Sequence, residues 1–302
     1  MELRQLRYFL KVAETLNFSL AGKELFITQS TLSQQISQLE KELGQKLFQR
    51  NSHEVILTEA GHTLLPLAHD TVNSANICVL RLQELKAMLV GELNIGVTFS
   101  FSMIAIETLM DFLKKYPKVK LNVCYGAMEE LMDKLTRHEL DFVLAFRPSV
   151  RNERIDSHVL FNNRLAAVVN ERHPIAKQKL VTLYEIDRFD LALPTKGLQA
   201  RNALEKMLAN TRHCLDAKIE MNNVSLLFKV IRESNYVTIL SESTVIDQRE
   251  LVAVPLDVPG NDMEGCIHVL KNSYIKASAR EFIRMLSSSS VMRNFGFNAL
   301  HE

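Results

Sequence analysis

Hydroxyl and amide side chains between residues 29 and 38 form the stretch best suited to contact nucleic acid. The stretch reads QSTLSQQISQ, and apolar residues recur through it at helical spacing: Leu32, Ile36, Leu39 and Leu43. These define the buried face of a helix, which leaves the polar groups on outward faces. A glutamine amide can pair bidentately with adenine, and a hydroxyl can reach a base or a phosphate. No acidic residue comes before Glu40 on the outward faces, so the pattern favours a DNA-reading helix.

Two shorter helices are expected to position this reading helix. Apolar spacing predicts the first over about the first 15 residues, and Ser19 is a suitable N-cap for the second, Leu20–Phe26. The three-residue turn Ile27–Gln29 would lead into the reading helix, predicted from about Ser30 to Leu43. Two short helices joined by a tight turn are the geometry that places the second helix in the major groove.

A wing and a long helix are expected next. Residues 47–57 indicate two short strands around a polar tip, Arg50–His53. Thr58 would cap a helix running to about Leu89, which at 1.5 Å per residue is roughly 45 Å long. Apolar residues step along it by three and four, at Leu64, Ala68, Val72, Ala75, Val79, Leu82, Leu85 and Leu89. We expect this stripe to meet a second copy of itself, because a small domain cannot cover a helix of that length.

From Gly91 onward the sequence alternates between strands and helices. Repeated strand–helix units of this length predict parallel sheets with helices on both faces, and about 210 residues is large for one such sheet. The fold expected for the chain is therefore α/β, with a largely helical N-terminal winged helix-turn-helix, a long linker helix and two C-terminal βα subdomains.

The C-terminal region offers candidate effector-binding residues in loops that follow strands and precede helices. Free N–H groups and the helix dipole favour an anion at such positions. The candidates are hydroxyl, amide and cationic side chains: Thr98, Ser100, Ser102, Arg147, Thr195, Lys196 and Asn223. They predict a small effector that is anionic rather than cationic. Each residue alone also fits an ordinary helix cap or turn.

Composition excludes several other classes. Apolar residues make up 47% of the chain and charged residues 24%, as in a globular protein. No apolar run is long enough to span a membrane, so no membrane is expected among the partners. The N-terminus lacks a secretory cleavage site, so a cytoplasmic location is expected. The sequence has no common catalytic motif, and its four cysteines and nine histidines lack metal spacing. We therefore expect no enzyme, no metal and no cofactor.

Residues 3–61 resemble the N-terminal signature of LysR-type transcriptional regulators. The matching runs occur in the family's order, as LRQLRYFLKVAETLNFS, QSTLSQQI, LEKELG, LFQR and LTEAG. The resemblance implies a sequence-specific regulator that binds double-stranded DNA at a dyad-related operator. Its expected DNA-binding residues are Gln29, Ser30, Thr31, Ser33, Gln34, Gln38, Arg50, Asn51 and His53.

The same resemblance implies an organisation for the whole chain. Residues 1–57 would bind DNA, residues 58–89 would form a dimerising linker, and residues 91–302 would form an effector domain like a periplasmic binding protein. Its subdomains would comprise residues 91–162 with 267–302, and residues 163–266, with the effector held between them. Pairing of linkers and of effector domains implies a homotetramer built as a dimer of dimers. Contact with RNA polymerase is also expected.

Two other interpretations remain open at this point. The chain could be a solute-binding receptor whose N-terminal part serves only for oligomerisation. Alternatively, a DNA-binding regulator could respond to thiol oxidation through Cys78, Cys124, Cys214 or Cys266. Reduced thiols are the expected state in a cytosolic chain.

Overall fold

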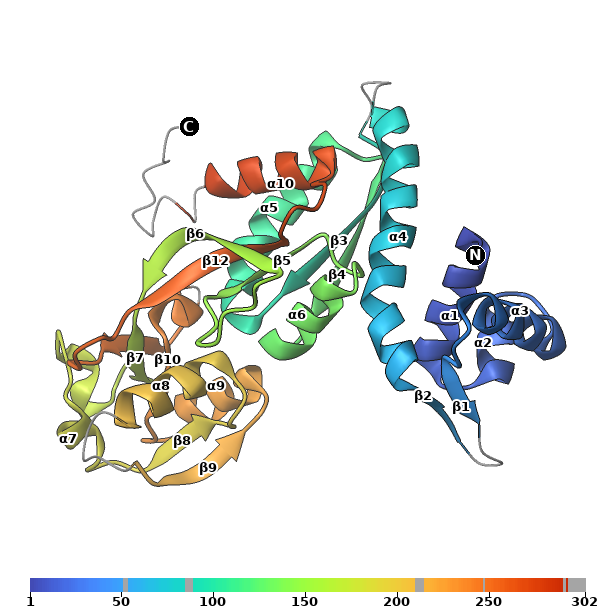
Figure 1. The fold of residues 1–302 in the computed structure, drawn as a ribbon. Coiled ribbons are helices and arrows are strands. Elements are labelled where there is room, and N and C mark those ends of the chain that lie inside the picture. Colours follow the sequence, from blue (N-terminus) through green and yellow to red (C-terminus); the bar gives the residue numbers. More distant parts are fainter. Residues whose placement is uncertain (51–53, 85–88, 210–214, 247, 290–291, 293–302) are drawn as a thin grey trace. The chain divides into compact units, whose positions relative to one another are not determined.

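The computed structural model describes residues 1–50, 54–84, 89–209, 215–246, 248–289 and 292 (Figure 1). The chain divides into two compact units, Met1–Met88 and Leu89–Glu302. Each unit has its own hydrophobic core.

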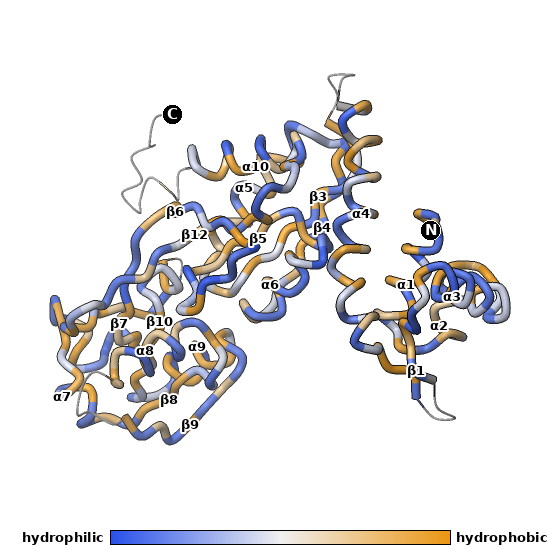
Figure 2. Tube along the Cα trace, viewed as in Figure 1, coloured by the Kyte–Doolittle hydropathy of each residue, from blue (hydrophilic) through white to orange (hydrophobic). Residues whose placement is uncertain are grey.

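The first unit is a three-helix domain with a wing, followed by a long helix. Its elements are α1 (Leu3–Thr15), α2 (Phe18–Glu24), α3 (Gln29–Leu43), β1 (Phe48–Arg50), β2 (Val55–Leu57) and α4 (Glu59–Glu84). The strands pair antiparallel, with Phe48 opposite Leu57. Apolar and polar residues alternate along these helices (Figure 2), and the apolar ones form a core that includes Phe9, Leu32 and Ile36. The winged helix-turn-helix expected from the sequence is confirmed.

The second helix begins two residues earlier than predicted. Asn17, and not Ser19, is its N-cap, because the Asn17 side chain accepts hydrogen bonds from the backbone of Ser19 and Leu20 at 2.9 and 3.0 Å. Phe18 is then the first helical residue, and its buried ring lies 5.7 Å from that of Phe48. The first helical residue therefore contributes an aromatic ring to the core.

A buried carboxylate joins α3 to the wing. Glu40 is only 4% exposed, and it accepts hydrogen bonds from the backbone N–H groups of Leu47 and Phe48 at 3.0 and 3.3 Å. Lys46 Nζ donates to the same carboxylate at 2.8 Å. Burial opposes ionisation, but these three donors outweigh it and lower the pKa of Glu40.

The wing is also joined directly to the start of α4. Thr58 donates from its backbone to Leu47 O at 3.0 Å and from its hydroxyl to Lys46 O at 2.5 Å. One turn later, a Cβ atom at Gly61 would overlap the carbonyl oxygen of Leu47. The helix backbone and the wing backbone therefore touch without a side chain between them.

The apolar stripe of α4 is divided between two environments, contrary to the expectation that the whole stripe meets a second copy. Leu64, Ala68 and Val72 pack against the core of the first unit, where α1 covers them. Val79 and Leu82 are 57% and 66% exposed. The helix is described as far as Glu84, so the predicted continuation to Leu89 lies outside the described residues. Only the C-terminal part of the stripe is left for another copy.

The second unit contains two subdomains. The first holds β3 (Gly91–Val97), η1 (Phe99–Phe101), α5 (Ser102–Lys115), β4 (Val119–Tyr125), α6 (Met128–Thr136), β5 (Phe142–Phe146), β6 (Ile155–Asn163), β12 (Met263–Leu270) and α10 (Ala277–Ser287). Its sheet has the order β4-β3-β5-β12-β6, parallel from β4 to β5 and antiparallel around β12. The expected parallel pairing is present from β4 to β5, but the antiparallel strand β12 makes the sheet mixed.

Helices cover both faces of this sheet, as predicted (Figure 1). The pleat of β5 sends Phe142 toward α10, where its ring lies 5.5 Å from Phe282. The neighbouring Val143 belongs to a separate cluster with Leu131 and Leu135 of α6. Alternation along one strand thus builds two cores.

The second subdomain carries the remaining elements. They are β7 (Leu165–Asn170), η2 (Pro174–Lys177), α7 (Leu183–Ile186), β8 (Leu191–Pro194), α8 (Gln199–Ala209), β9 (Ala217–Met221), α9 (Val224–Arg232), β10 (Thr238–Ser241), η3 (Glu242–Val245) and β11 (Leu251–Pro255). β7 lies between β10 and β11, antiparallel to both, and β8 pairs parallel with β9.

Strand β6 and the start of β12 change the division between subdomains. Strand β6 was not predicted from the sequence, and residues up to 266 were expected to belong to the second subdomain. In the structure β12 starts at Met263 and pairs with β5 and β6 of the first sheet. Cys266 therefore lies in the first sheet.

Candidate DNA-binding and effector-binding sites

The outward face of α3 is polar and accessible. Five of the predicted DNA-binding residues are exposed: Gln29, Ser30, Thr31, Gln34 and Gln38. Ser33 is half-buried on the same helix. Thr28, which the sequence analysis placed in the turn, caps the helix by accepting from Thr31 N at 3.2 Å. The cap orders the N-terminal turn, where a recognition helix contacts base edges.

The wing residues are described only in part. Arg50 is the last residue of β1, but its side chain is outside the described part of the structure. Asn51 and His53 also lie outside the described residues. Their role on DNA stays a prediction.

The loop after β3 holds three of the predicted effector residues, which differ in their partners. Thr98 is 5% exposed, and its hydroxyl donates to Leu144 O at 3.2 Å, which ties the loop to β5. Ser102 is the first residue of α5 and donates to Phe99 O at 2.7 Å. Ser100 is half-buried, and its hydroxyl has no protein partner among the described residues.

An amide side chain connects this edge of the first sheet to the second subdomain. Gln199, the first residue of α8, donates to Phe146 O at 2.9 Å and accepts from Phe146 N at 3.3 Å. Phe146 ends β5, next to Thr98 and its loop. The bonds bring the N-terminus of α8, together with Thr195 and Lys196 just before it, to the carboxyl edge of the first sheet. We call this region the subdomain junction.

Aromatic side chains extend the subdomain junction toward α9. The Phe99 ring lies 5.9 Å from Phe228 of α9 and 6.5 Å from Tyr125 at the end of β4. Asn223 caps α9 by accepting from Leu226 N at 3.0 Å. Gln199 and Phe228 were not predicted from the sequence, since nothing local distinguishes an amide or a phenyl ring that bridges two subdomains.

A groove of about 1870 Å³ opens on one side of the junction. Arg147 lines it, together with Met128, Gln199 and Asn202. The Arg147 guanidinium forms an ion pair with Glu264, which also lines the groove. Of the predicted effector residues, Arg147 alone lines this groove.

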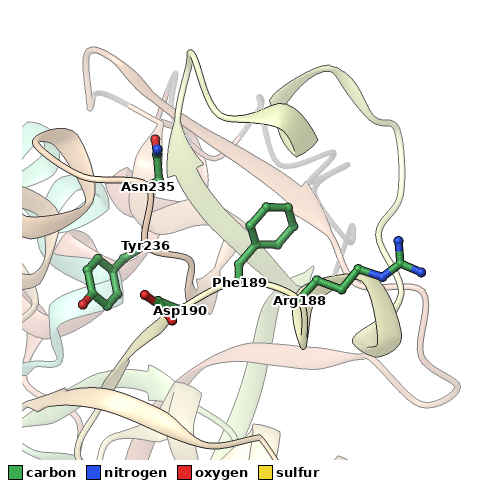
Figure 3. A pocket seen from close by; sticks show the side chains of 5 residues that line it. All are labelled: Arg188, Phe189, Asp190, Asn235 and Tyr236. Atoms are coloured by element: carbon green, nitrogen blue, oxygen red, sulfur yellow. The ribbon is translucent and has the colours of Figure 1, made fainter.

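A smaller pocket of about 290 Å³ has none of the predicted effector residues in its lining (Figure 3). It is lined by Arg188, Phe189, Asp190, Asn235 and Tyr236. Two of these are already engaged: the Phe189 ring packs on His173 at 4.6 Å, and Asp190 pairs with Lys218 at 2.7 Å. The pocket therefore offers few free groups to a ligand.

The three described cysteines are unpaired in different surroundings. Cys78 is exposed, Cys124 is half-buried and Cys266 is buried, while Cys214 lies outside the described residues. Burial raises the pKa of Cys266 to about 11. Strands β3 and β5 separate β4 from β12, so the strands that carry Cys124 and Cys266 lie about 14 Å apart at a spacing of ~4.8 Å per strand. A disulfide needs Cα atoms within about 7 Å.

Within the described residues, no group of His, Cys, Asp and Glu is arranged to hold a metal ion. The described helices also include none that combines the length and apolarity needed to cross a bilayer.

Comparisons with known proteins agree with both units. Residues 3–62 match the model of the bacterial regulatory helix-turn-helix protein, LysR family, and residues 86–290 match that of the LysR substrate binding domain. The RuBisCO operon transcriptional regulator of Allochromatium vinosum is 26% identical over 263 residues, covering 86% of each chain.

Solved structures share the fold. Full-length OxyR from Pseudomonas aeruginosa has a TM-score of 0.76 at 20% identity, covering 100% of this chain and 99% of that one. CbnR in complex with its target DNA has a TM-score of 0.62 at 19% identity, covering 96% of this chain and 100% of that one. The chain belongs to the LysR family: it is a DNA-binding transcriptional regulator with an effector-binding domain, from a family of regulators and not of enzymes.

Proposed function

We propose that α3 lies in the major groove and reads bases through Gln34 and its polar neighbours, while Arg50 and the wing contact the DNA backbone. The observation that carries this proposal is the ordered, exposed and acid-free N-terminal half of α3. Glutamine amides can read adenine, and hydroxyls can reach bases or phosphates. The likeness in fold to CbnR, solved with its target DNA, supports DNA binding by this chain.

Competition binding across single-base variants of a bound duplex tests this placement. We expect Gln34→Ala to lose about 1–3 kcal/mol of discrimination at one base pair, and Arg50→Ala to weaken all duplexes alike. Gln45→Ala is a matched control, because Gln45 is an exposed glutamine beyond the end of α3. An unchanged base preference for Gln34→Ala would remove that residue from the reading surface.

For the effector, we propose a small organic anion bound at the subdomain junction. Ser100 offers an unpartnered hydroxyl, and α5 and α8 begin there; the N-terminus of a helix favours negative charge. Arg147 supplies a cation near the same edge of the sheet. Binding between the subdomains would then change their separation and, through α4, the DNA-binding unit.

Calorimetry with a panel of organic acids and amines tests the effector class. We expect an acid to bind, and Ser100→Ala to weaken it about tenfold. Ser287→Ala, which removes a hydroxyl from α10, is the control. Tight binding of an amine that is insensitive to Ser100→Ala would contradict the proposal.

We also propose a cytoplasmic homotetramer in which a linker dimer is the smallest DNA-binding unit at a dyad-related operator. Exposed Val79 and Leu82 on α4 support the linker contact. A regulator of this kind would act with RNA polymerase at a promoter. Light scattering of the full chain measures the assembly directly, and a monomeric mass at working concentration would contradict it.

A further inference from the structure

Phe26 stands in the turn between α2 and α3, and 95% of its surface is exposed. No other large apolar residue in the described part of the chain is so exposed. Its neighbours Leu25 and Ile27 both pack against the core of the first unit. The turn therefore directs two apolar side chains inward and leaves the phenyl ring in solvent.

The backbone at this position also disfavours phenylalanine. Phe26 has a φ angle of +56°, in the left-handed region. Glycine, asparagine and aspartate occupy this region readily, whereas a bulky side chain is strained there. Asparagine at Phe26 would relieve the strain and remove the exposed ring, so the stability of the domain does not explain the phenylalanine.

The turn holds Phe26 at the edge of the proposed DNA-binding surface. Phe26 N donates to Lys23 O at 3.2 Å, and Ile27 N donates to Gly22 O at 2.9 Å, so the turn is closed on α2. Thr28, two residues after Phe26, caps α3. The exposed ring thus precedes the helix turn whose side chains reach base edges in helix-turn-helix complexes.

We propose that Phe26 contacts DNA, with its ring against a thymine methyl group beside the base pairs read by α3. This inference rests on the proposed placement of α3 in the major groove. The exposed side chains of α3 at this end are hydroxyls and amides, which select hydrogen-bonding edges. The thymine C5-methyl is the apolar group on the major-groove edge, and phenylalanine is among the residues that contact it.

The test uses the full chain and the tightest duplex that it selects from a random-sequence library. Each thymine of that duplex is replaced in turn by deoxyuridine, which removes only the methyl group. We expect the affinity of the wild type to fall about fourfold when one particular thymine is replaced, because the complex then buries one methyl group less. Phe26→Asn should bind the parent duplex about tenfold more weakly and lose its sensitivity to that deoxyuridine, while its melting temperature stays the same or rises.

Leu16→Asn is the matched control, because Leu16 also has a positive φ of 48° and is 47% exposed, but lies before α2. It should keep both the affinity and the deoxyuridine sensitivity of the wild type. Wild-type affinity for Phe26→Asn, or a loss without a change in deoxyuridine sensitivity, would overturn the inference.

Gln34→Ala separates this failure from that of the proposed function. If Gln34→Ala changes base preference while Phe26→Asn has no effect, the inference on Phe26 alone fails. If neither variant changes base preference or affinity, the placement of α3 in the groove fails with it.

Discussion

Polar side chains on α3 and at the subdomain junction are used differently in the free protein. Gln29 and Gln34 are exposed and have no intramolecular partner among the described residues. At the junction, Thr98 and Asn223 already bond to the backbone, and Arg147 pairs with Glu264. The two glutamine amides are therefore free to meet a partner, although the Ser30 and Thr31 hydroxyls bond to Thr28. An effector at the junction must compete with bonds that Thr98, Asn223 and Arg147 already make.

The largest effect is expected from separating the DNA-binding units. We expect the double variant Val79→Glu/Leu82→Glu to lose the dimer contact between linker helices. Its operator affinity should fall about 10²–10⁴-fold, because the second half-site no longer adds to binding. Light scattering and gel shifts measure both quantities. Thr71→Glu, which adds a charge at an exposed polar position of α4, should change neither. Wild-type mass and affinity for the double variant would show that the linker contact lies elsewhere.

A smaller effect is expected where α3 meets the wing. Glu40→Ala leaves the N–H groups of Leu47 and Phe48 without their acceptor, so the free energy of unfolding should fall by about 2–4 kcal/mol. Glu42→Ala is the control, because Glu42 is 53% exposed and pairs with the N-terminal amine. Urea denaturation compares the two, and equal losses would contradict the role of Glu40.

The lowered pKa of Glu40 gives this prediction a pH dependence. A carboxyl with a lowered pKa in the folded state stabilises fully above its unfolded pKa, about 4.3, and less as pH falls through the folded value. The stability difference between the wild type and Glu40→Gln should thus be constant near neutral pH and shrink below about pH 4.3. A difference that grows on acidification would refute this.

At the subdomain junction, loss of one amide should have a modest effect. Gln199→Leu removes both bonds to Phe146, and we expect about 1 kcal/mol of destabilisation and faster hydrogen exchange around residue 146. Gln178→Leu, whose amide makes one long exposed contact of 3.5 Å, should show neither change. Unaltered exchange in Gln199→Leu would mean that other contacts hold the junction.

Thiol oxidation should have the smallest effect. We expect mild peroxide to leave DNA affinity unchanged, because Cys266 is buried with a raised pKa and cannot reach Cys124. Intact mass with and without alkylation checks this expectation. A stoichiometric loss of two hydrogens accompanied by altered affinity would instead support the redox interpretation.

The sequence predicted the elements that local patterns define. Leu32, Ile36 and Leu39 repeat at helical spacing and are all buried in α3. The predicted start of α2 was wrong because Asn17 and Ser19 are both good N-caps. The packing of Phe18 favours Asn17. Local pattern does not contain that packing.

The missing parts depend on distant contacts. Strand β6 has the sequence IDSHVLFNN, and its polar start does not resemble a strand. The segment pairs with β12, which is distant in the sequence. The bonds of Gln199 to Phe146 join residues 53 positions apart, so the junction could not be assembled from sequence. The loops were predicted as effector sites. Only the structure shows that the side chains of Thr98 and Asn223 bond to the protein's own backbone.

The contact between Gly61 and Leu47 has a mechanical consequence. A layer of side chains between a helix and a strand can absorb small rotations through rotamer changes, but backbone against backbone cannot. The first turn of α4 and the start of the wing should therefore move together as one rigid body. A few degrees of rotation in the linker would then turn the wing by the same angle, and a Cβ atom at position 61 would push the two backbones apart.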